Sequence, residues 1–430
     1  DLVMGDSGHG VFNAAGVLTS ITTISPDIGG IDTINTGDGL NIVLGGIGGD
    51  TINGGSGRDI VLGDNGNATF DNTGVLTLIQ TSDAATPGSY DDIINGFGGD
   101  NLILGGNGND TITTLGGNDL VVGDNGQATF DSTGGASVIR ELISTDAGIG
   151  GNDTINVGEG SNIILGGFGK DGITGGAGSD IGTGDNGRGV FNAAGGLTSL
   201  STINPEIGDT DTITVGAGNN VFFGGNGGDT ITTLGGRDVL VGDNGNASFD
   251  NSGVLLNIQT SDAASGGVDT IEAGAGNNIA LGGSAGDTIT TGTGDDLVFG
   301  DNASLTFLSG LVVSSRTIDN GIGGADTIRA GAGADVLIGG AFADRIDGGA
   351  GDDLIIGDNA VIDRTNRVGN FSDPLFQTLA GGLIYDNAAI ALNDDIPRLP
   401  PGGAAFWGDF TVTLLDHSFA EQGTVGSTRF

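Results

Sequence analysis

The 430-residue sequence has no cysteine, two histidines, one tryptophan and only twelve lysine and arginine residues. Without cysteine the chain can form neither disulfides nor thiolate metal sites. With two histidines and no HExxH motif, it cannot build the usual zinc sites or a Ser-His catalytic set. The sequence has no basic patch, which argues against nucleic acid as a partner. No apolar run approaches the roughly 18 residues that indicate a membrane span.

Glycine and aliphatic residues are what the chain has instead. Its 91 glycines are about three times the usual fraction of roughly 7%. They lack the every-third spacing of collagen, so they indicate turns. Hydrophobic residues make up 36% of the chain, which is low for a globular core and adequate for a thin solenoid.

The charge is one-sided and carried by aspartate. The net charge of −42 comes from 54 acidic residues, of which only five are glutamates: Glu141, Glu159, Glu206, Glu272 and Glu421. Glutamate would serve solubility equally well, whereas a tight loop that ligates an ion favours the shorter side chain. Because so acidic a chain repels itself and resists compaction, we infer that cations hold the fold together.

Residues 45–62 contain two consecutive, in-phase copies of the pattern GGxGxDxUx, where U is a large aliphatic residue. Glycines at the first, second and fourth positions allow a sharp turn and a close approach of neighbouring backbones. The x-U-x segment suits a three-residue strand with one apolar side chain, Ile52 or Ile60, that points into a core. Two nonapeptides therefore predict one solenoid coil of about 18 residues.

Loops one coil apart stack on the same edge of such a solenoid, so the aspartates at the sixth position lie near one another. Their carboxylates can supply oxygens to a cation held between adjacent loops. Calcium suits such a site, because it is a hard ion that takes 6–8 oxygens from carboxylates and carbonyls in flexible geometry. The sequence thus predicts several Ca2+ ions as cofactors.

The repeat is organised in six units of about 59 residues, marked by the tetrapeptide GDNG or a near variant at Gly5, Gly63, Gly123, Gly184, Gly242, Gly300 and Gly357. Each unit carries four in-phase positions nine residues apart, which we predict to be metal ligands. They are Asp32, Asn41, Asp50 and Asp59; Asp92, Asn101, Asp110 and Asp119; Asp153, Asn162, Asp171 and Asp180; Asp211, Asn220, Asp229 and Asp238; Asp269, Asn278, Asp287 and Asp296; and Asp326, Asp335, Asp344 and Asp353.

The second position is asparagine in five of the six units. Asparagine keeps a carbonyl oxygen but adds no charge, so this row should hold calcium more weakly than the all-aspartate row. The alternative is a ladder of stacked amides that hydrogen-bond along the solenoid. The two arrangements can coexist.

Each unit opens with an insert of about two dozen residues that has the signature of a β-hairpin. The inserts come in three kinds, which implies a super-repeat of about 179 residues formed by duplication of a three-unit block. A phenylalanine recurs at matching places, and it predicts either core packing under the hairpins or a lateral interaction surface. These residues are Phe12, Phe70, Phe130, Phe191, Phe249 and Phe307.

We divide the chain into a solenoid over residues 1–360 and a non-repeat segment over 361–430, which contains the only tryptophan and four of the seven prolines. The segment is interpreted as a cap for the last coil, as an assembly segment whose strand-like run 410–414 pairs with another edge, or as part of a further domain. Since Asp1 lies in mid-repeat, we interpret the sequence as a piece of something longer.

The matches to catalytic motifs are chance matches that arise from the glycine-rich repeat. The GxSxG match at 282–286 lies in phase inside a nonapeptide rather than between a strand and a helix. Matches to GxGxxG do not open a helix. The regular period of the carboxylates argues for ion binding and against a single acid–base pair. We expect no enzymatic activity.

Because of these nonapeptides, the chain resembles the RTX calcium-binding repeat proteins. The resemblance covers roughly residues 29–358. The resemblance implies an all-β, parallel β-roll or β-helix solenoid that is secreted unfolded, by bacterial type I secretion, and folds on calcium outside the cell. Regular hairpin inserts depart from the plain β-roll attached to secreted enzymes. They favour a giant adhesin, surface-layer or filament protein with no membrane span.

We therefore expect an extracellular structural or adhesive segment that binds itself or a cell or polysaccharide surface. The alternative is the export module of a secreted protease, lipase or polysaccharide epimerase whose catalytic domain lies elsewhere. A further idea is ice or polysaccharide binding by a flat threonine-rich face that includes Thr111, Thr113, Thr114, Thr230, Thr232 and Thr233.

Overall fold

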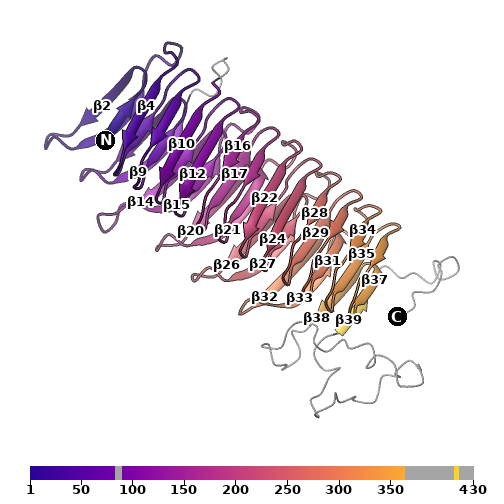
Figure 1. The fold of residues 1–430 in the computed structure, drawn as a ribbon. Coiled ribbons are helices and arrows are strands. Elements are labelled where there is room, and N and C mark those ends of the chain that lie inside the picture. The colour runs from indigo at the N-terminus through magenta and orange to yellow at the C-terminus, as the bar shows by residue number, and fades with distance from the viewer. Residues whose placement is uncertain (83–89, 364–410, 416–430) are drawn as a thin grey trace, which may run out of the picture.

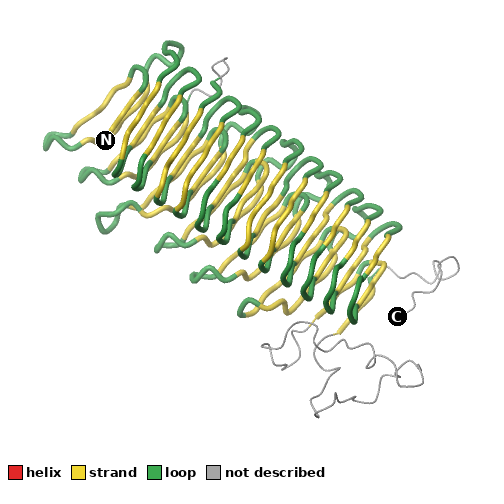
Figure 2. The backbone as a smooth tube through the Cα atoms, viewed as in Figure 1, coloured by secondary structure: helices red, strands yellow, loops and turns green. Residues whose placement is uncertain are grey.

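The computed structural model describes residues 1–82, 90–363 and 411–415, and every regular element in them is a β-strand. The strands stack along one axis into an elongated solenoid, with the first coil at one end and β37 near the other (Figure 1). Loops line the edges of the stack (Figure 2). The expected all-β solenoid is confirmed.

The strands form three sheets that run the length of the solenoid. The first is a parallel sheet that forms the middle of the three layers, and we call it the central sheet. Its thirteen strands are β1 (Leu2–Met4), β5 (Ile42–Leu44), β7 (Ile60–Leu62), β11 (Leu102–Leu104), β13 (Leu120–Val122), β17 (Ile163–Gly167), β19 (Ile181–Asp185), β23 (Val221–Phe223), β25 (Val239–Val241), β29 (Ile279–Gly283), β31 (Leu297–Asp301), β35 (Val336–Gly340) and β37 (Leu354–Asp358).

The second sheet is also parallel and closes the other wall of the roll; we call it the outer sheet. Its twelve strands are β4 (Thr33–Gly37), β6 (Thr51–Gly54), β10 (Ile93–Gly98), β12 (Thr111–Gly116), β16 (Thr154–Asn156), β18 (Gly172–Thr174), β22 (Thr212–Ala217), β24 (Thr230–Gly235), β28 (Thr270–Glu272), β30 (Thr288–Thr290), β34 (Thr327–Arg329) and β36 (Arg345–Asp347).

The third sheet is antiparallel and is built from the inserts; we call it the hairpin sheet. Its fourteen strands are β2 (Gly8–Phe12), β3 (Leu18–Thr23), β8 (Gly66–Phe70), β9 (Leu76–Thr81), β14 (Gly126–Asp131), β15 (Val138–Ser144), β20 (Gly187–Phe191), β21 (Leu197–Thr202), β26 (Gly245–Phe249), β27 (Leu255–Thr260), β32 (Ala303–Leu308), β33 (Leu311–Thr317), β38 (Ala360–Asp363) and β39 (Thr411–Leu414).

The register confirms a coil of two nonapeptides. Ile42 of β5 pairs with Ile60 of β7, and Thr33 of β4 pairs with Thr51 of β6, so the chain advances by one strand every 18 residues within a unit. The inserts do not complete a third coil; each leaves the roll as a hairpin. Twelve intervals of about 4.8 Å along the central sheet give a stack about 58 Å long.

The layers explain the strand sequences. The central sheet is covered on both faces, by the outer sheet and by the hairpins, so its strands are continuous apolar runs such as LIL in β11. Among the residues that the structure describes, the outer sheet is covered on one face only. Its strands alternate, as in Thr111-Ile112-Thr113, where Ile112 is fully buried and the threonines face outward.

The recurrent phenylalanine packs in the core between the hairpins and the central sheet, which decides between the two interpretations given above. Phe130, Phe191, Phe249 and Phe307 are buried and Phe70 packs against the same cluster. Phe12, in the first hairpin, is 61% exposed. Core packing is therefore the role of this row wherever a neighbouring hairpin covers it.

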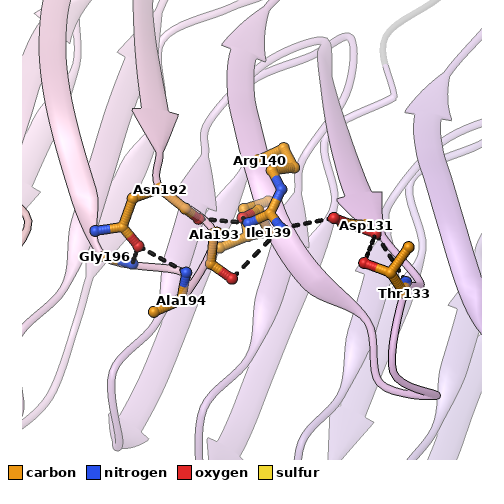
Figure 3. Close-up of polar contacts among 8 residues, drawn as sticks. All are labelled: Asp131, Thr133, Ile139, Arg140, Asn192, Ala193, Ala194 and Gly196. Atoms are coloured by element: carbon orange, nitrogen blue, oxygen red, sulfur yellow. Dashed lines mark hydrogen bonds and ion pairs between the residues drawn. The ribbon is translucent and has the colours of Figure 1, made fainter.

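Neighbouring hairpins are also tied together through their turns. The Arg140 guanidinium pairs with Asp131 in its own hairpin and donates to the carbonyls of Asn192 and Ala193 in the turn of the next one (Figure 3). A second ion pair joins Arg188 of β20 to Glu141 of β15 at 2.6 Å. Both contacts lie at the junction between the third and fourth units, where the two three-unit blocks meet.

Of the C-terminal segment, the structure describes only 361–363 and 411–415. The run 410–414, which the sequence predicts to be a strand, contains β39. This strand pairs antiparallel with β38 of the same chain and is the last strand of the hairpin sheet. The remainder of the predicted cap or assembly segment, including Trp407, lies outside the described residues, so the division at 360 stays a prediction. Within the described part there is no helix suited to crossing a membrane.

Candidate metal centre

Twelve aspartates form one continuous row where the chain turns from the central sheet, or from a hairpin, into the outer sheet. We call this row the aspartate edge. It consists of Asp32, Asp50, Asp92, Asp110, Asp153, Asp171, Asp211, Asp229, Asp269, Asp287, Asp326 and Asp344. The nine-residue phase thus brings together half of the predicted ligands, and all of them are aspartate.

Eleven of the twelve carboxylates of the aspartate edge, all except Asp32, accept a hydrogen bond from the main chain of the preceding coil. The Asp153 N–H donates to Asp171 Oδ1 at 2.8 Å, and the Asp171 N–H donates to Asp211 Oδ1 at 2.7 Å. The same bond recurs without interruption from Asp32 to Asp344. One oxygen of each side chain is therefore fixed in place by the fold.

The second oxygen of these carboxylates is buried and has no protein partner. This holds for Oδ2 of eleven of the twelve residues, all except Asp32 at the first coil. A buried carboxylate oxygen without a hydrogen bond is costly. A row of such oxygens indicates ligands for a cation.

Main-chain oxygens converge on the same places. A glycine follows each central-sheet strand at this edge, and a Cβ built on Gly105 would lie 2.5 Å from Asp110 Oδ2 and 1.9 Å from the Gly123 carbonyl oxygen. The same pair of oxygens, a carboxylate Oδ2 and a glycine carbonyl, faces the missing Cβ at twelve glycines: Gly5, Gly45, Gly63, Gly105, Gly123, Gly166, Gly184, Gly224, Gly242, Gly282, Gly300 and Gly339. Any other residue would fill this space.

Burial, and after it the crowding of negative charge, raises the pKa values of the buried carboxyls along the aspartate edge. Burial raises the pKa of Asp92 to about 10, and repulsion from Asp110 and Asp64 adds to it. Burial also raises the pKa of Asp326 to about 8 and that of Asp229 to about 7. In the absence of a cation, the protein thus disfavours the charged form of these groups.

The other twelve predicted ligands form a second row, which we call the mixed edge, where the chain returns from the outer sheet to the central sheet. It consists of Asn41, Asp59, Asn101, Asp119, Asn162, Asp180, Asn220, Asp238, Asn278, Asp296, Asp335 and Asp353. Main-chain N–H groups donate to the side-chain oxygens here too, as from Asn162 to Asp180 Oδ1 at 3.1 Å. Asparagine amides also join neighbouring coils, with Asn162 Nδ2 donating to Asp180 Oδ1 at 2.8 Å. These amides hydrogen-bond along the solenoid, but to carboxylates rather than to one another, because asparagine and aspartate alternate along this edge.

Sequence reasoning missed a third set of aspartates, those of the GDNG tetrapeptides, which it used only as unit markers. We call them the hairpin-entry aspartates: Asp6, Asp64, Asp124, Asp185, Asp243 and Asp301. Asp124 accepts hydrogen bonds from Gly151 N–H at 2.8 Å and from Phe168 N–H, so it fastens the exit of its hairpin to the next glycine turn. Their recurrence once per unit was the available signal.

Of the predicted threonine face, only part lies on the surface. Thr111, Thr113, Thr230 and Thr232 point outward from the outer sheet, whereas Thr114 and Thr233 are buried. Strands β12 and β24 run six residues instead of the expected three. Alternation therefore turns their fourth residue inward.

The donor set fits calcium. In the described residues, no group of three or more histidine, cysteine, aspartate or glutamate side chains converges as a metal site. An ion at the aspartate edge would therefore be held by carboxylates together with glycine carbonyls, which are the hard oxygen donors that calcium accepts. When bound, the ion would neutralise buried carboxylates on adjacent coils.

The comparisons agree with this assignment. The model of the RTX calcium-binding nonapeptide repeat matches residues 35–70, 88–112, 95–130, 148–181, 214–247, 264–298, 281–303 and 320–355. No curated protein and no solved structure matches the chain. The matched segments cover just over half of the chain and include both edges of the roll. The chain therefore belongs to the family of RTX calcium-binding nonapeptide repeat proteins.

Proposed function

We propose that this chain is a non-catalytic, calcium-stiffened segment of an extracellular structural or adhesive protein, such as a bacterial adhesin, surface-layer or filament protein. The observation that carries the proposal is the unbroken row of buried carboxylate oxygens without partners along the aspartate edge. Such a row resists folding when it is charged and favours folding when cations fill it.

The difference in calcium concentration between the cytosol and the external medium would control where the chain folds. Extracellular calcium modules bind typically at about 10⁻⁴–10⁻³ M. Sites of this kind stay empty in a cytosol and fill in an external medium. A chain with a net charge of −42 would then remain extended during export and fold after it. RTX repeats are typical of secreted bacterial proteins, which supports type I secretion and an extracellular location.

The uncovered face of the outer sheet supports an adhesive role. The three-residue repeats of its twelve strands give 24 outward positions, of which fourteen are threonine and four asparagine, and Leu115 and Leu234 are exposed beyond them in β12 and β24. Two acidic residues, Glu272 and Asp347, are balanced by Arg329 and Arg345. In a strongly acidic chain this flat face is neutral and rich in hydroxyl and amide groups. We propose that it hydrogen-bonds to an uncharged polysaccharide surface.

The adhesive role is tested by charging this face. Thr212 and Thr214 are exposed neighbours of Thr230 and Thr232 in the sheet register. We expect the double variant Thr212→Glu, Thr214→Glu to adsorb less to insoluble neutral polysaccharide particles in calcium. The double variant Ala193→Glu, Ala194→Glu, on an exposed hairpin turn, adds the same charge and is the matched control, which should adsorb as the wild type does. Equal adsorption by all three proteins would exclude this face as the adhesive surface.

The alternative is that the repeats serve as the export module of a secreted enzyme. The matching family model describes repeats rather than a catalytic domain. Light scattering during calcium addition separates the two roles, because a structural subunit assembles as it folds and a module remains monomeric. Scattering that stays at the monomer level, with no adsorption to surfaces, would favour the module.

A further inference from the structure

Both edges of the roll carry an acidic or amide side chain in every coil, but the atoms around these side chains differ between the two edges. At the aspartate edge, a carboxylate Oδ2 and a glycine carbonyl oxygen converge on the position that the Cβ of a glycine would otherwise take. The matching position of the mixed edge lies five residues before each aspartate or asparagine. What occupies that position decides whether the two edges bind ions alike.

Side chains fill this position at most of the mixed edge. Gly175 shows where they lie, because a Cβ built on it would be 2.4 Å from Asp180 Oδ2 and 2.9 Å from Val215 Cγ1. Phe97 fills the same space beside Gly54. In eight of the twelve turns the residue itself carries the side chain, and all but the first are buried: Thr36, Thr114, Val157, Val215, Thr233, Ala273, Thr291 and Ala330.

Asparagine amides occupy the main-chain oxygens that remain. Asn41 Nδ2 donates to the carbonyls of Gly37 and Gly39, both at 3.2 Å, and to Asp59 Oδ1 at 2.8 Å. Asn278 Nδ2 donates to two glycine carbonyls of its own turn at 3.0 Å. An amide nitrogen and a cation cannot occupy the same place, so these oxygens are not available as metal ligands.

We propose that calcium binds along the aspartate edge only, and that the mixed edge is closed without metal by asparagine amides and by buried threonine, valine and alanine side chains. The proposal rests on the calcium dependence proposed above. Mixed-edge aspartates also have buried Oδ2 atoms without partners. What they lack is a glycine carbonyl oxygen beside the Oδ2 atom, because none is among the nearest atoms at Gly175 or Gly348.

A matched pair in one unit tests the proposal. Asp171 of the aspartate edge and Asp180 of the mixed edge lie nine residues apart and are equally buried. We expect Asp171→Asn to bind at least one calcium ion fewer per chain, measured by equilibrium dialysis, and to lose part of the calcium-induced rise in melting temperature. Asp180→Asn should keep the wild-type stoichiometry. An equal loss of ions from both variants would overturn the proposal.

A gain-of-site variant gives the reverse test. Asn162→Asp alone should add no ion, because Val157 still fills the space, whereas Asn162→Asp combined with Val157→Gly should add one. An ion gained by the single variant would contradict the proposal.

If Asp171→Asn does not fold, crystals of the wild type grown with terbium decide the question through anomalous difference maps. We expect peaks on the aspartate edge only, and peaks of equal height on both edges would refute the inference. A wild-type chain that binds no calcium would remove the proposed function as well. Ions found on both edges would remove only this inference.

Discussion

At the residue scale, the aspartate edge places the two oxygens of one carboxylate in different environments. Asp171 Oδ1 accepts the Asp153 N–H, while its Oδ2 is buried without a partner. The first contact orients the side chain and needs no metal. The second leaves a charge that either a cation or a proton must neutralise. Calcium and acid should therefore act on the same groups.

This predicts that the metal-free protein is more stable in acid than at neutral or alkaline pH. An ordinary aspartate has a pKa near 3.9 when unfolded, and burial raises the folded values to about 8 for Asp326, 9 for Asp287 and 10 for Asp92. Stability from the protonated carboxyls is full below the unfolded pKa and is lost as the pH rises through the folded values. Thermal melts in EGTA should show a folded state with a midpoint at pH 5, and a lower midpoint or no folded baseline at pH 8.

Calcium provides the control for this pH dependence. In saturating calcium the difference between pH 5 and pH 8 should shrink or reverse, because the cation takes over from the proton at high pH. A metal-free midpoint that rises with pH would contradict the assignment of these buried carboxylates.

The hairpin-entry aspartates make a separate prediction. Asp124→Ala leaves the half-buried N–H groups of Gly151 and Phe168 without their acceptor. We expect the variant to lose about 1–3 kcal/mol of unfolding free energy, measured by urea denaturation in calcium. Asp352→Ala removes an equal charge from an exposed position and should change stability by less than about 0.5 kcal/mol. Equal effects would show that Asp124 acts through charge alone.

At the element scale, each strand of the outer sheet separates a structural face from an exposed one. In β12, Ile112 is fully buried in the roll while Thr111 points outward beside it. The hairpins cover the opposite side of the stack and pack on the central sheet. Stability should therefore depend on alternate residues of the same strand.

Adjacent substitutions in β12 test this division. Ile112→Ala should cost about 2–5 kcal/mol, because it removes buried methyl groups and leaves a cavity. Thr111→Ala should change the unfolding free energy by less than about 0.5 kcal/mol. Chemical denaturation in saturating calcium measures both. Comparable losses from the two variants would mean that the outer face is covered in solution.

The sequence predicts the elements better than it predicts the contacts between units. The nine-residue phase places Ile52 correctly in the interior of the roll, because both the turn and the short strand are local. In the second nonapeptide it is Val61 that points into the roll, whereas Ile60 is buried against the hairpins. The hairpins are equally predictable from their turns. The role of Asp124 could not be predicted from the sequence. Its carboxylate accepts hydrogen bonds from N–H groups 27 and 44 residues away, and the position of these groups depends on how the hairpin folds back. The side chain of Thr114 points inward because β12 is longer than the three residues that the nonapeptide pattern predicts.

At the scale of the whole molecule, the solenoid that the structure describes is a narrow rod in which each strand of the two parallel sheets pairs only with those of the neighbouring coils. Such a chain cannot collapse around a single large core, and its stability is a sum of coil and interface contributions. With a net charge of −42, the interfaces at the aspartate edge are repulsive until they are neutralised. Folding should then proceed along the stack as ions bind, and calcium should stiffen the whole rod.

The most direct measurement of this claim is far-UV circular dichroism during a calcium titration from EGTA to about 10 mM, with magnesium as the control, over the range in which extracellular sites fill. Calcium-driven folding predicts a cooperative gain of β-structure with calcium and little change with magnesium. Full β-structure in EGTA at neutral pH would contradict it, because the carboxylate rows would then be compatible with a folded, metal-free solenoid.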